Sequence, residues 1–210
     1  SYERKRKRMK IIAVGRNYVD HIEELKNDFP SSPVIFTKPD SAILLKNDPF
    51  YYPPFSKSIH HEVEVVIKIK KAGKNIQEKF AHKYFDEIGL GIDFTARDIQ
   101  SELKKKGLPW DLAKGFNGSA PLSQFVPKEK YELGNLNFNL EVNDQKKQVG
   151  NTSKMIYSID FIISFVSQYF TLKIGDLIFT GTPAGVGEVK IGDNLKGYLE
   201  KDLMFDFNVK

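Results

Sequence analysis

Short runs of alternating hydrophobic residues recur along the chain. In the clearest of them, over residues 61–70, every second position from 63 to 69 is a branched aliphatic residue, which predicts a strand. Residues 136–142 alternate in the same way and end at Asn143-Asp144, a dipeptide that favours a tight hairpin turn. Residues 176–180 form a short apolar run of the kind found in buried strands.

Fewer segments have the three-to-four-residue spacing of a helix. Residues 158–170 show it most clearly, and residues 19–26 and 96–106 are shorter candidates. Thr95 and Asp98 have the spacing of a capping box at the start of the last of these. Because strands are short and many while helices are few, the pattern predicts a β-rich α+β fold.

Length and composition narrow the class of protein. The chain has 210 residues, of which 40% are hydrophobic and 28% charged, and we expect one catalytic domain over residues 9–210. The absence of cysteine excludes disulfides, thiolate metal sites and a cysteine nucleophile. No apolar run approaches the ~20 residues of a membrane span, so we expect no membrane contact and a cytoplasmic location.

The net charge of +5 raises the alternative of a non-catalytic nucleic-acid-binding module. Residues 1–8 hold five Lys or Arg and one Glu, so they carry +4, and the other 202 residues carry only +1. We interpret this basic segment before Met9 as an extension that is disordered or vector-derived. We therefore expect no nucleic-acid partner for the domain.

Three carboxylates are candidates for a metal site. Glu62 and Glu64 are two residues apart on the predicted strand and so share one face, and Asp93 ends a separate apolar run. Carboxylate oxygens are hard ligands that suit Mg²⁺ or Mn²⁺, with Ca²⁺ as a further candidate. The alternative is that the two glutamates form the solvated face of a half-buried strand.

Five segments, in this order along the chain, resemble the fumarylacetoacetate hydrolase family. They are Val14-Gly15-Arg16-Asn17-Tyr18 with Asp20-His21, His60-His61-Glu62-Val63-Glu64, Asp93-Phe94-Thr95-Ala96-Arg97-Asp98, Lys106-Gly107-Leu108-Pro109-Trp110 with Lys114, and residues 180–187. The short single-domain acylpyruvate hydrolases, which also act as oxaloacetate decarboxylases or tautomerases, are the most similar members. The resemblance implies a mixed β-sandwich or β-roll, a homodimer, and a mobile segment over the site at residues 17–32.

The resemblance also implies a reaction. The resemblance assigns the metal ligands of the family to Glu62, Glu64 and Asp93 in this chain. A 2-oxo acid can chelate such a metal, which would stabilise the enolate formed when the C3–C4 bond of an acylpyruvate is cleaved. We therefore expect a Mg²⁺- or Mn²⁺-dependent acylpyruvate hydrolase. The alternatives are an oxaloacetate decarboxylase or keto–enol tautomerase, or a related isomerase or hydratase of 2-oxo acids.

The remaining candidate residues would act on water or substrate. His21 and Glu24 are three apart, so on a helix they share a face, and the resemblance assigns them to water activation. Lys114 is a candidate electrostatic partner for the substrate carboxylate or for the enolate. We expect four residues to bind substrate, namely Arg16, Arg97, Gln100 and Thr182. The alternative for His21 and Glu24 is that they are ordinary exposed helix residues. The alternative for Thr182 is that its glycine-rich segment is a purely structural turn.

Overall fold

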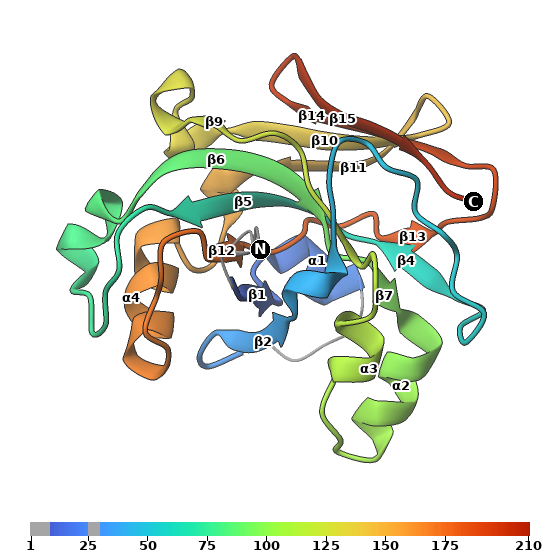
Figure 1. The fold of residues 1–210 in the computed structure, drawn as a ribbon, viewed down its shortest axis with the longest axis horizontal. Helices are drawn as coiled ribbons and strands as arrows, with labels where there is room; N and C mark the ends of the chain where they lie inside the picture. The colour runs from blue at the N-terminus through green and yellow to red at the C-terminus, as the bar shows by residue number, and fades with distance from the viewer. Residues whose placement is uncertain (1–8, 25–29) are drawn as a thin grey trace, which may run out of the picture.

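The computed structural model describes residues 9–24 and 30–210 and shows many strands and few helices (Figure 1). This confirms the predicted β-rich α+β fold. The basic extension at residues 1–8 lies outside the described residues and stays a prediction. The mobility of residues 17–32 also stays a prediction, and residues 25–29 of that segment lie outside the described range.

A mixed six-stranded sheet forms the centre of the fold, with its strands in the order β2-β1-β12-β5-β6-β9. β1 and β12 run parallel, and each other neighbouring pair runs antiparallel. The bounds are β1 (Ile11–Gly15), β2 (Val34–Lys38), β5 (Val63–Ile69), β6 (Phe85–Ile92), β9 (Val126–Pro127) and β12 (Leu177–Phe179).

An antiparallel four-stranded sheet lies over β5 and β6 in Figure 1 and shares a hydrophobic core with them that includes Val65, Leu90, Leu140 and Phe205. At the predicted hairpin, Asn143-Asp144, the φ angles of 52° and 61° are those of a type I′ turn. The hairpin prediction is therefore confirmed. The strands are β10 (Asn137–Val142), β11 (Gln145–Asn151), β14 (Asn194–Leu199) and β15 (Asp202–Asn208).

Two predicted helices form largely as expected. α4 (Ile159–Tyr169) begins after Ser158, whose hydroxyl accepts a hydrogen bond from the Phe161 amide at 3.1 Å. α1 (Val19–Glu24) covers the described part of the predicted 19–26 helix. In Figure 1 it lies beside β1, at the centre of the molecule.

The capping box predicted for the third helix is wrong. α2 (Arg97–Lys105) has Ala96 at its N-cap, which makes no side-chain capping bond, and the Ile99 amide of the first turn donates instead to the Asp98 carboxylate at 2.9 Å. The hydroxyl of Thr95 instead donates to the Asp93 carbonyl at 3.2 Å. Asp98 ties the helix to the preceding loop, because its carboxylate accepts from the Ser56 hydroxyl at 2.7 Å. Thr95 and Asp98 therefore connect segments near the candidate site instead of forming a capping box.

Smaller elements connect these parts. α3 (Asp111–Lys114) follows α2, and both lie at the lower edge of the molecule in Figure 1. Two short sheets have the orders β13-β4-β7 and β3-β8. Their bounds, with those of the 3₁₀ turns, are β3 (Ile43–Leu44), β4 (Ile59–His61), β7 (Thr95–Ala96), β8 (Ala120–Pro121), β13 (Gly187–Glu188), η1 (Asp40–Ala42), η2 (Glu78–Lys83), η3 (Lys128–Lys130), η4 (Leu133–Asn135) and η5 (Thr152–Lys154).

Strand β5 is buried on both faces. Val63 and Val65 join the core beneath the four-stranded sheet, while Val66 joins a second apolar cluster on the opposite side. Glu62 and Glu64 are 5% and 1% exposed, so they do not form a solvated polar face. Burying carboxylates in this way is costly unless they are hydrogen-bonded, paired or bound to a metal.

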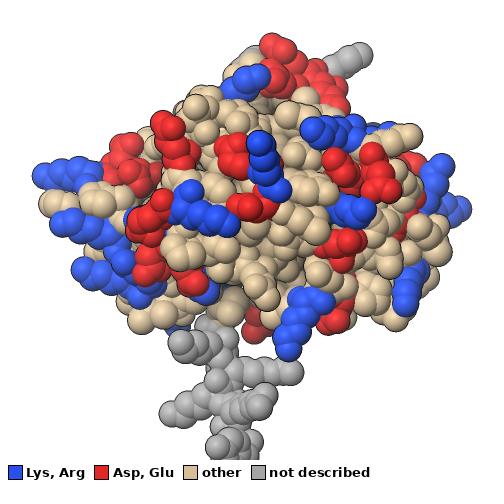
Figure 2. Space-filling view, turned by 90° about the horizontal axis from the view of Figure 1, so that it is seen from above, with Lys and Arg blue, Asp and Glu red and all other residues tan. Residues whose placement is uncertain are grey.

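On the face shown in Figure 2, basic and acidic side chains are interspersed. No helix among residues 9–24 and 30–210 is long and apolar enough to cross a membrane.

Candidate active site

Three carboxylates converge where β5 and β6 meet. Strand register pairs Val63 with Ile92, so Asp93 lies beside Glu62, whose carbonyl accepts from the Asp93 amide at 2.8 Å. Glu64 is the next residue along β5 on the same side. One ligand oxygen from each carboxylate lies within 4.8 Å of the others, and all three side chains are buried. The structure therefore brings together the three predicted metal ligands.

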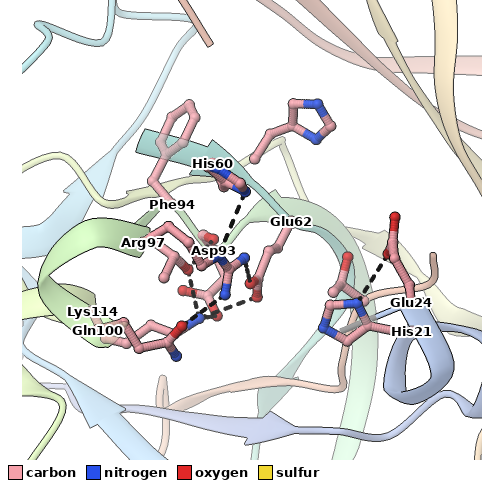
Figure 3. A network of polar contacts seen from close by, with 12 residues as sticks. His21, Glu24, His60, Glu62, Asp93, Phe94, Arg97, Gln100 and Lys114 are labelled. Carbon is pink, nitrogen blue, oxygen red and sulfur yellow. Dashed lines mark hydrogen bonds and ion pairs between the residues drawn. The ribbon is translucent and has the colours of Figure 1, made fainter. Parts of the chain in front are cut away.

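Two buried lysines neutralise part of this charge, and Figure 3 shows one of them, Lys114. The Lys114 ammonium lies 2.8 Å from Asp93, 3.1 Å from Glu62 and 2.6 Å from the Thr95 hydroxyl, so protein acceptors use all three of its hydrogens. Burial acts to lower the pKa of Lys114, but the charges of Asp93 and Glu62 outweigh it and raise the pKa. On the other side of Asp93, the ammonium of Lys38 lies 2.6 Å from Oδ1.

Glu64 is held differently from its neighbours. Its carboxylate accepts from the Gly181 amide at 2.8 Å, and no Lys or Arg among the described residues forms an ion pair with it. Burial, followed by repulsion from Asp93 and Glu62, raises the pKa of Glu64 well above its usual value. A cation between the three carboxylates would remove this repulsion.

The donor set fits a hard divalent cation. All three groups offer carboxylate oxygens, which Mg²⁺ and Mn²⁺ prefer, and no softer ligand competes at the cluster. The three oxygens lie within 4.8 Å of one another, so a cation between them would be within reach of all three carboxylates. Glu62, Glu64 and Asp93 are the residues that would hold it.

Arg97 and Gln100 converge on this cluster, as their spacing predicted (Figure 3). The guanidinium of Arg97 donates to Glu62 at 2.6 Å and to the Gln100 side-chain carbonyl at 2.8 Å. Burial acts to raise the pKa of Glu62, but Lys114 and Arg97 outweigh it and hold the pKa well below its usual value. Glu62 therefore stays ionised and available as a ligand.

His21 and Glu24 form a pair in the same region (Figure 3). Nδ1 of His21 lies 3.5 Å from Glu24 Oε2. The amide of Gly185 donates to both oxygens of Glu24, at 3.1 and 3.0 Å, and so fixes the carboxylate. Burial lowers the pKa of His21 below 6.5. The ring is then neutral at pH 7 with Nδ1 facing Glu24, which leaves Nε2 as the nitrogen that can accept a proton.

Thr182 lies in the pocket wall, but its hydroxyl is already used. It donates to the Val63 carbonyl at 2.8 Å and accepts from the Gln148 side chain at 2.8 Å. Gln148 also accepts a hydrogen bond from the Val63 amide at 3.0 Å. The Thr182 hydroxyl is therefore engaged in holding the pocket wall together, and a contact between Thr182 and substrate stays a prediction.

One pocket contains nearly all the predicted residues. Its lining includes His21, Glu62, Glu64, Arg97, Gln100, Lys114, Thr182 and Arg16. Two charged residues near the carboxylates were missed by sequence reasoning, namely Lys38 beside Asp93 and Lys104 in the pocket lining. Single lysines carry no distinguishing pattern in a chain with 32 Lys and Arg, although Lys104 lies one turn after Gln100 on α2.

The family model described as "Fumarylacetoacetate (FAA) hydrolase C-terminal" matches residues 10–203. This chain belongs to the fumarylacetoacetate hydrolase family. It is 45% identical over 201 residues to "Oxaloacetate tautomerase FAHD1, mitochondrial" of Bos taurus, covering 95% of this chain and 91% of that protein. It is 46% identical over 202 residues to "Oxaloacetate decarboxylase, mitochondrial" of Dictyostelium discoideum, covering 94% and 93%.

A solved structure supports the family fold. The fumarylpyruvate hydrolase of Pseudomonas aeruginosa, in complex with Mn²⁺ and pyruvate, has a TM-score of 0.90 and 30% sequence identity, covering 95% of this chain and 88% of that one. The resemblance noted from the five sequence segments is thereby confirmed, and the protein is an enzyme of this family.

Proposed function

We propose that this protein is a divalent-metal-dependent oxaloacetate keto–enol tautomerase. Relatives that are 45–46% identical over nearly the whole chain carry oxaloacetate names, which supports this alternative over the acylpyruvate hydrolase expected first. The observation that carries the proposal is the pocket itself. It combines Glu62, Glu64 and Asp93, which would hold the ion, with a neutral histidine on the same lining.

Tautomerisation moves a proton between C3 and the 2-oxo oxygen. A divalent cation in the site would stabilise, as a Lewis acid, the negative charge that develops on that oxygen. In the enol-forming direction Nε2 of His21 accepts the C3 proton, and the imidazolium so formed gives a proton to the 2-oxo oxygen; ketonisation reverses both transfers, so His21 ends neutral and no proton is gained or lost overall. Glu24, fixed by the Gly185 amide, keeps the His21 proton on Nδ1 and the base on Nε2.

The surrounding cations keep the ligands in place. Lys114 bridges Glu62 and Asp93, and Arg97 holds the other oxygen of Glu62. Since Lys114 directs all three of its hydrogens to protein acceptors and Arg97 donates to Glu62 and Gln100, we assign both residues to positioning the carboxylates rather than to proton transfer.

Decarboxylation of oxaloacetate is a second candidate, supported by the Dictyostelium relative. Breaking the C3–C4 bond releases CO₂ and leaves the same charge on the 2-oxo oxygen, so the carboxylate cluster serves both reactions. This reaction needs no base at C3. It therefore differs from tautomerisation in its dependence on His21.

Hydrolysis of an acylpyruvate is a third candidate, supported by the His21–Glu24 pair and by the Pseudomonas aeruginosa hydrolase structure. In this reaction His21 would accept a proton from water as the water attacks the acyl carbon.

The homodimer, the cytoplasmic location and the lack of nucleic-acid or membrane partners remain predictions. Both relatives named above have "mitochondrial" in their names.

Three assays separate these functions. Loss of enol absorbance from freshly dissolved enol-oxaloacetate measures tautomerisation, and pyruvate release from oxaloacetate and from acetylpyruvate measures the other two reactions. We expect the first to be fastest, to require Mg²⁺ or Mn²⁺, and to stop with EDTA. Metal-independent enol loss, or pyruvate release from acetylpyruvate faster than enol conversion, would overturn the proposal.

A further inference from the structure

The cations of the pocket fall into two groups. Lys38, Lys114 and Arg97 each form an ion pair with Glu62 or Asp93. Arg16 and Lys104 line the same pocket, yet neither forms an ion pair with a carboxylate in the described parts of the chain. The first group thus compensates the protein's own charge, and the second is available for an anion from outside.

Arg16 is held in an unusual conformation at the end of β1. Its φ is 58°, a left-handed value that is unfavourable for a residue with a side chain. The next residue, Asn17, maintains the turn, because its side chain donates to the carbonyls of Thr180 at 2.7 Å and Tyr157 at 3.0 Å. Nε of Arg16 is buried and has no hydrogen-bond partner among the described residues. The chain thus maintains a strained turn that presents an unpartnered guanidinium nitrogen at the pocket.

Lys104 approaches the same pocket from the last turn of α2. Its ammonium lies 5.1 Å from the centre of the Trp110 ring, which also lines the pocket. Burial, followed by repulsion from Arg16, lowers the pKa of Lys104 to about 8. Among the neighbouring charges, Arg16 therefore acts on Lys104 most strongly. Arg16 and Lys104 thus line one pocket and repel each other more strongly than either is compensated by an ion pair, and an anion between them would remove this repulsion.

We propose that Arg16 and Lys104 bind the second carboxylate of a dicarboxylic 2-oxo acid, and so make the enzyme selective for such substrates over acylpyruvates whose acyl group is uncharged. This inference rests on the proposed function, in which the 2-oxo acid end of the substrate occupies the carboxylate cluster. A neutral acyl group would leave both cations without a partner, whereas a second carboxylate satisfies both.

The test compares ligands with and without the second carboxylate. Calorimetry on Mn²⁺-loaded protein gives Kd for 2-oxoglutarate, a stable dicarboxylic 2-oxo acid, and for pyruvate, while kinetics give KM for oxaloacetate. Lys104→Met keeps the aliphatic stem over Trp110 but removes the charge. The matched control is Lys106→Met, an exposed lysine on the same segment.

We expect Lys104→Met to raise Kd for 2-oxoglutarate and KM for oxaloacetate at least about tenfold, as for loss of one charged hydrogen bond. Kd for pyruvate, Mn²⁺ affinity and Tm should stay near wild type, and Lys104→Arg should restore dicarboxylate binding. If Lys104→Met fails to fold, Lys104→Gln takes its place. Equal losses for pyruvate and 2-oxoglutarate, or no loss for either dicarboxylate, would overturn the inference.

Failure of this inference can be told apart from failure of the proposed function. Wild-type tautomerase activity with an unchanged KM in Lys104→Met would refute the inference and leave the function intact. Lys104-dependent binding of 2-oxoglutarate by a protein that does not turn over oxaloacetate would do the reverse.

Discussion

The two regions of the pocket that we propose to act in the reaction are built in different ways. Glu62, Glu64 and Asp93 lie where the central strands β5 and β6 adjoin, and all three are buried. Asp93 forms ion pairs with both Lys38 and Lys114. His21 and Glu24 lie on a six-residue helix that is tied to the glycine-rich loop through one amide, that of Gly185. We therefore expect the first region to contribute to stability as well as to the proposed reaction, and the second to contribute to the reaction with little effect on stability.

The largest effect should follow from breaking the first region. Asp93→Asn leaves the fully buried Lys38 without its carboxylate, so we expect about 3–5 kcal/mol of lost stability. Tautomerase activity should fall by roughly 10³-fold or more, because metal stabilisation of several kcal/mol is lost. Denaturant unfolding and the enol assay measure the two effects.

The control for this substitution is Asp86→Asn, which removes a half-exposed ion pair with Lys70. It should cost less than about 1 kcal/mol and leave activity unchanged. If Asp93→Asn were as stable as this control, the ion pairs around Asp93 would not have the structural role given to them.

His21→Ala tests the second region. Tautomerisation should drop about 10²–10⁴-fold, the usual contribution of a general base, while decarboxylation changes little because it needs no base at C3. Unfolding free energy should change far less than for Asp93→Asn. Equal loss of both activities would show that His21 acts on the metal site and not as a base.

A smaller effect is expected at Gly185. Its φ is +96°, and a Cβ there would lie 2.1 Å from the Lys147 carbonyl oxygen, so Gly185→Ala must displace the loop. The amide then no longer fixes Glu24, and we expect a roughly tenfold fall in kcat for tautomerisation. Gly187→Ala is the control, because its Cβ would meet only His61 Nε2 at 3.4 Å. Full activity of Gly185→Ala would show that the loop does not position the His21–Glu24 pair.

The smallest effect concerns pH. Burial lowers the pKa of His21 from the ordinary histidine value of 6.5, and a base must be unprotonated to act, so kcat/KM should fall on the acid side of that value. Because Glu24 raises the pKa of His21, Glu24→Gln should move this fall to lower pH. An inflection above 6.5, or a shift in the opposite direction, would contradict this assignment.

The sequence predicted the site where local spacing determines geometry. Period-two spacing placed Glu62 and Glu64 on one face of a strand, and three-residue spacing placed His21 next to Glu24. The sequence could not show that β5 is buried on both faces, because the residues that cover one of these faces come from the distant strands of the four-stranded sheet.

Long-range contacts explain what was missed. Lys38 reaches Asp93 across 55 residues of chain, and Gln148 reaches Thr182 across 34. Thr95 was expected to cap α2, yet its hydroxyl is held by the Asp93 carbonyl and the Lys114 ammonium. Here tertiary contacts outweigh a local capping preference, and only the assembled fold reveals them.

The most direct test of the central claim is calorimetric titration of the metal-free protein with Mn²⁺. The account predicts one site per chain in wild type, and loss of binding in the variant carrying Glu62→Gln, Glu64→Gln and Asp93→Asn together. Unchanged Mn²⁺ binding in that variant, or no binding by a folded and active wild type, would contradict it.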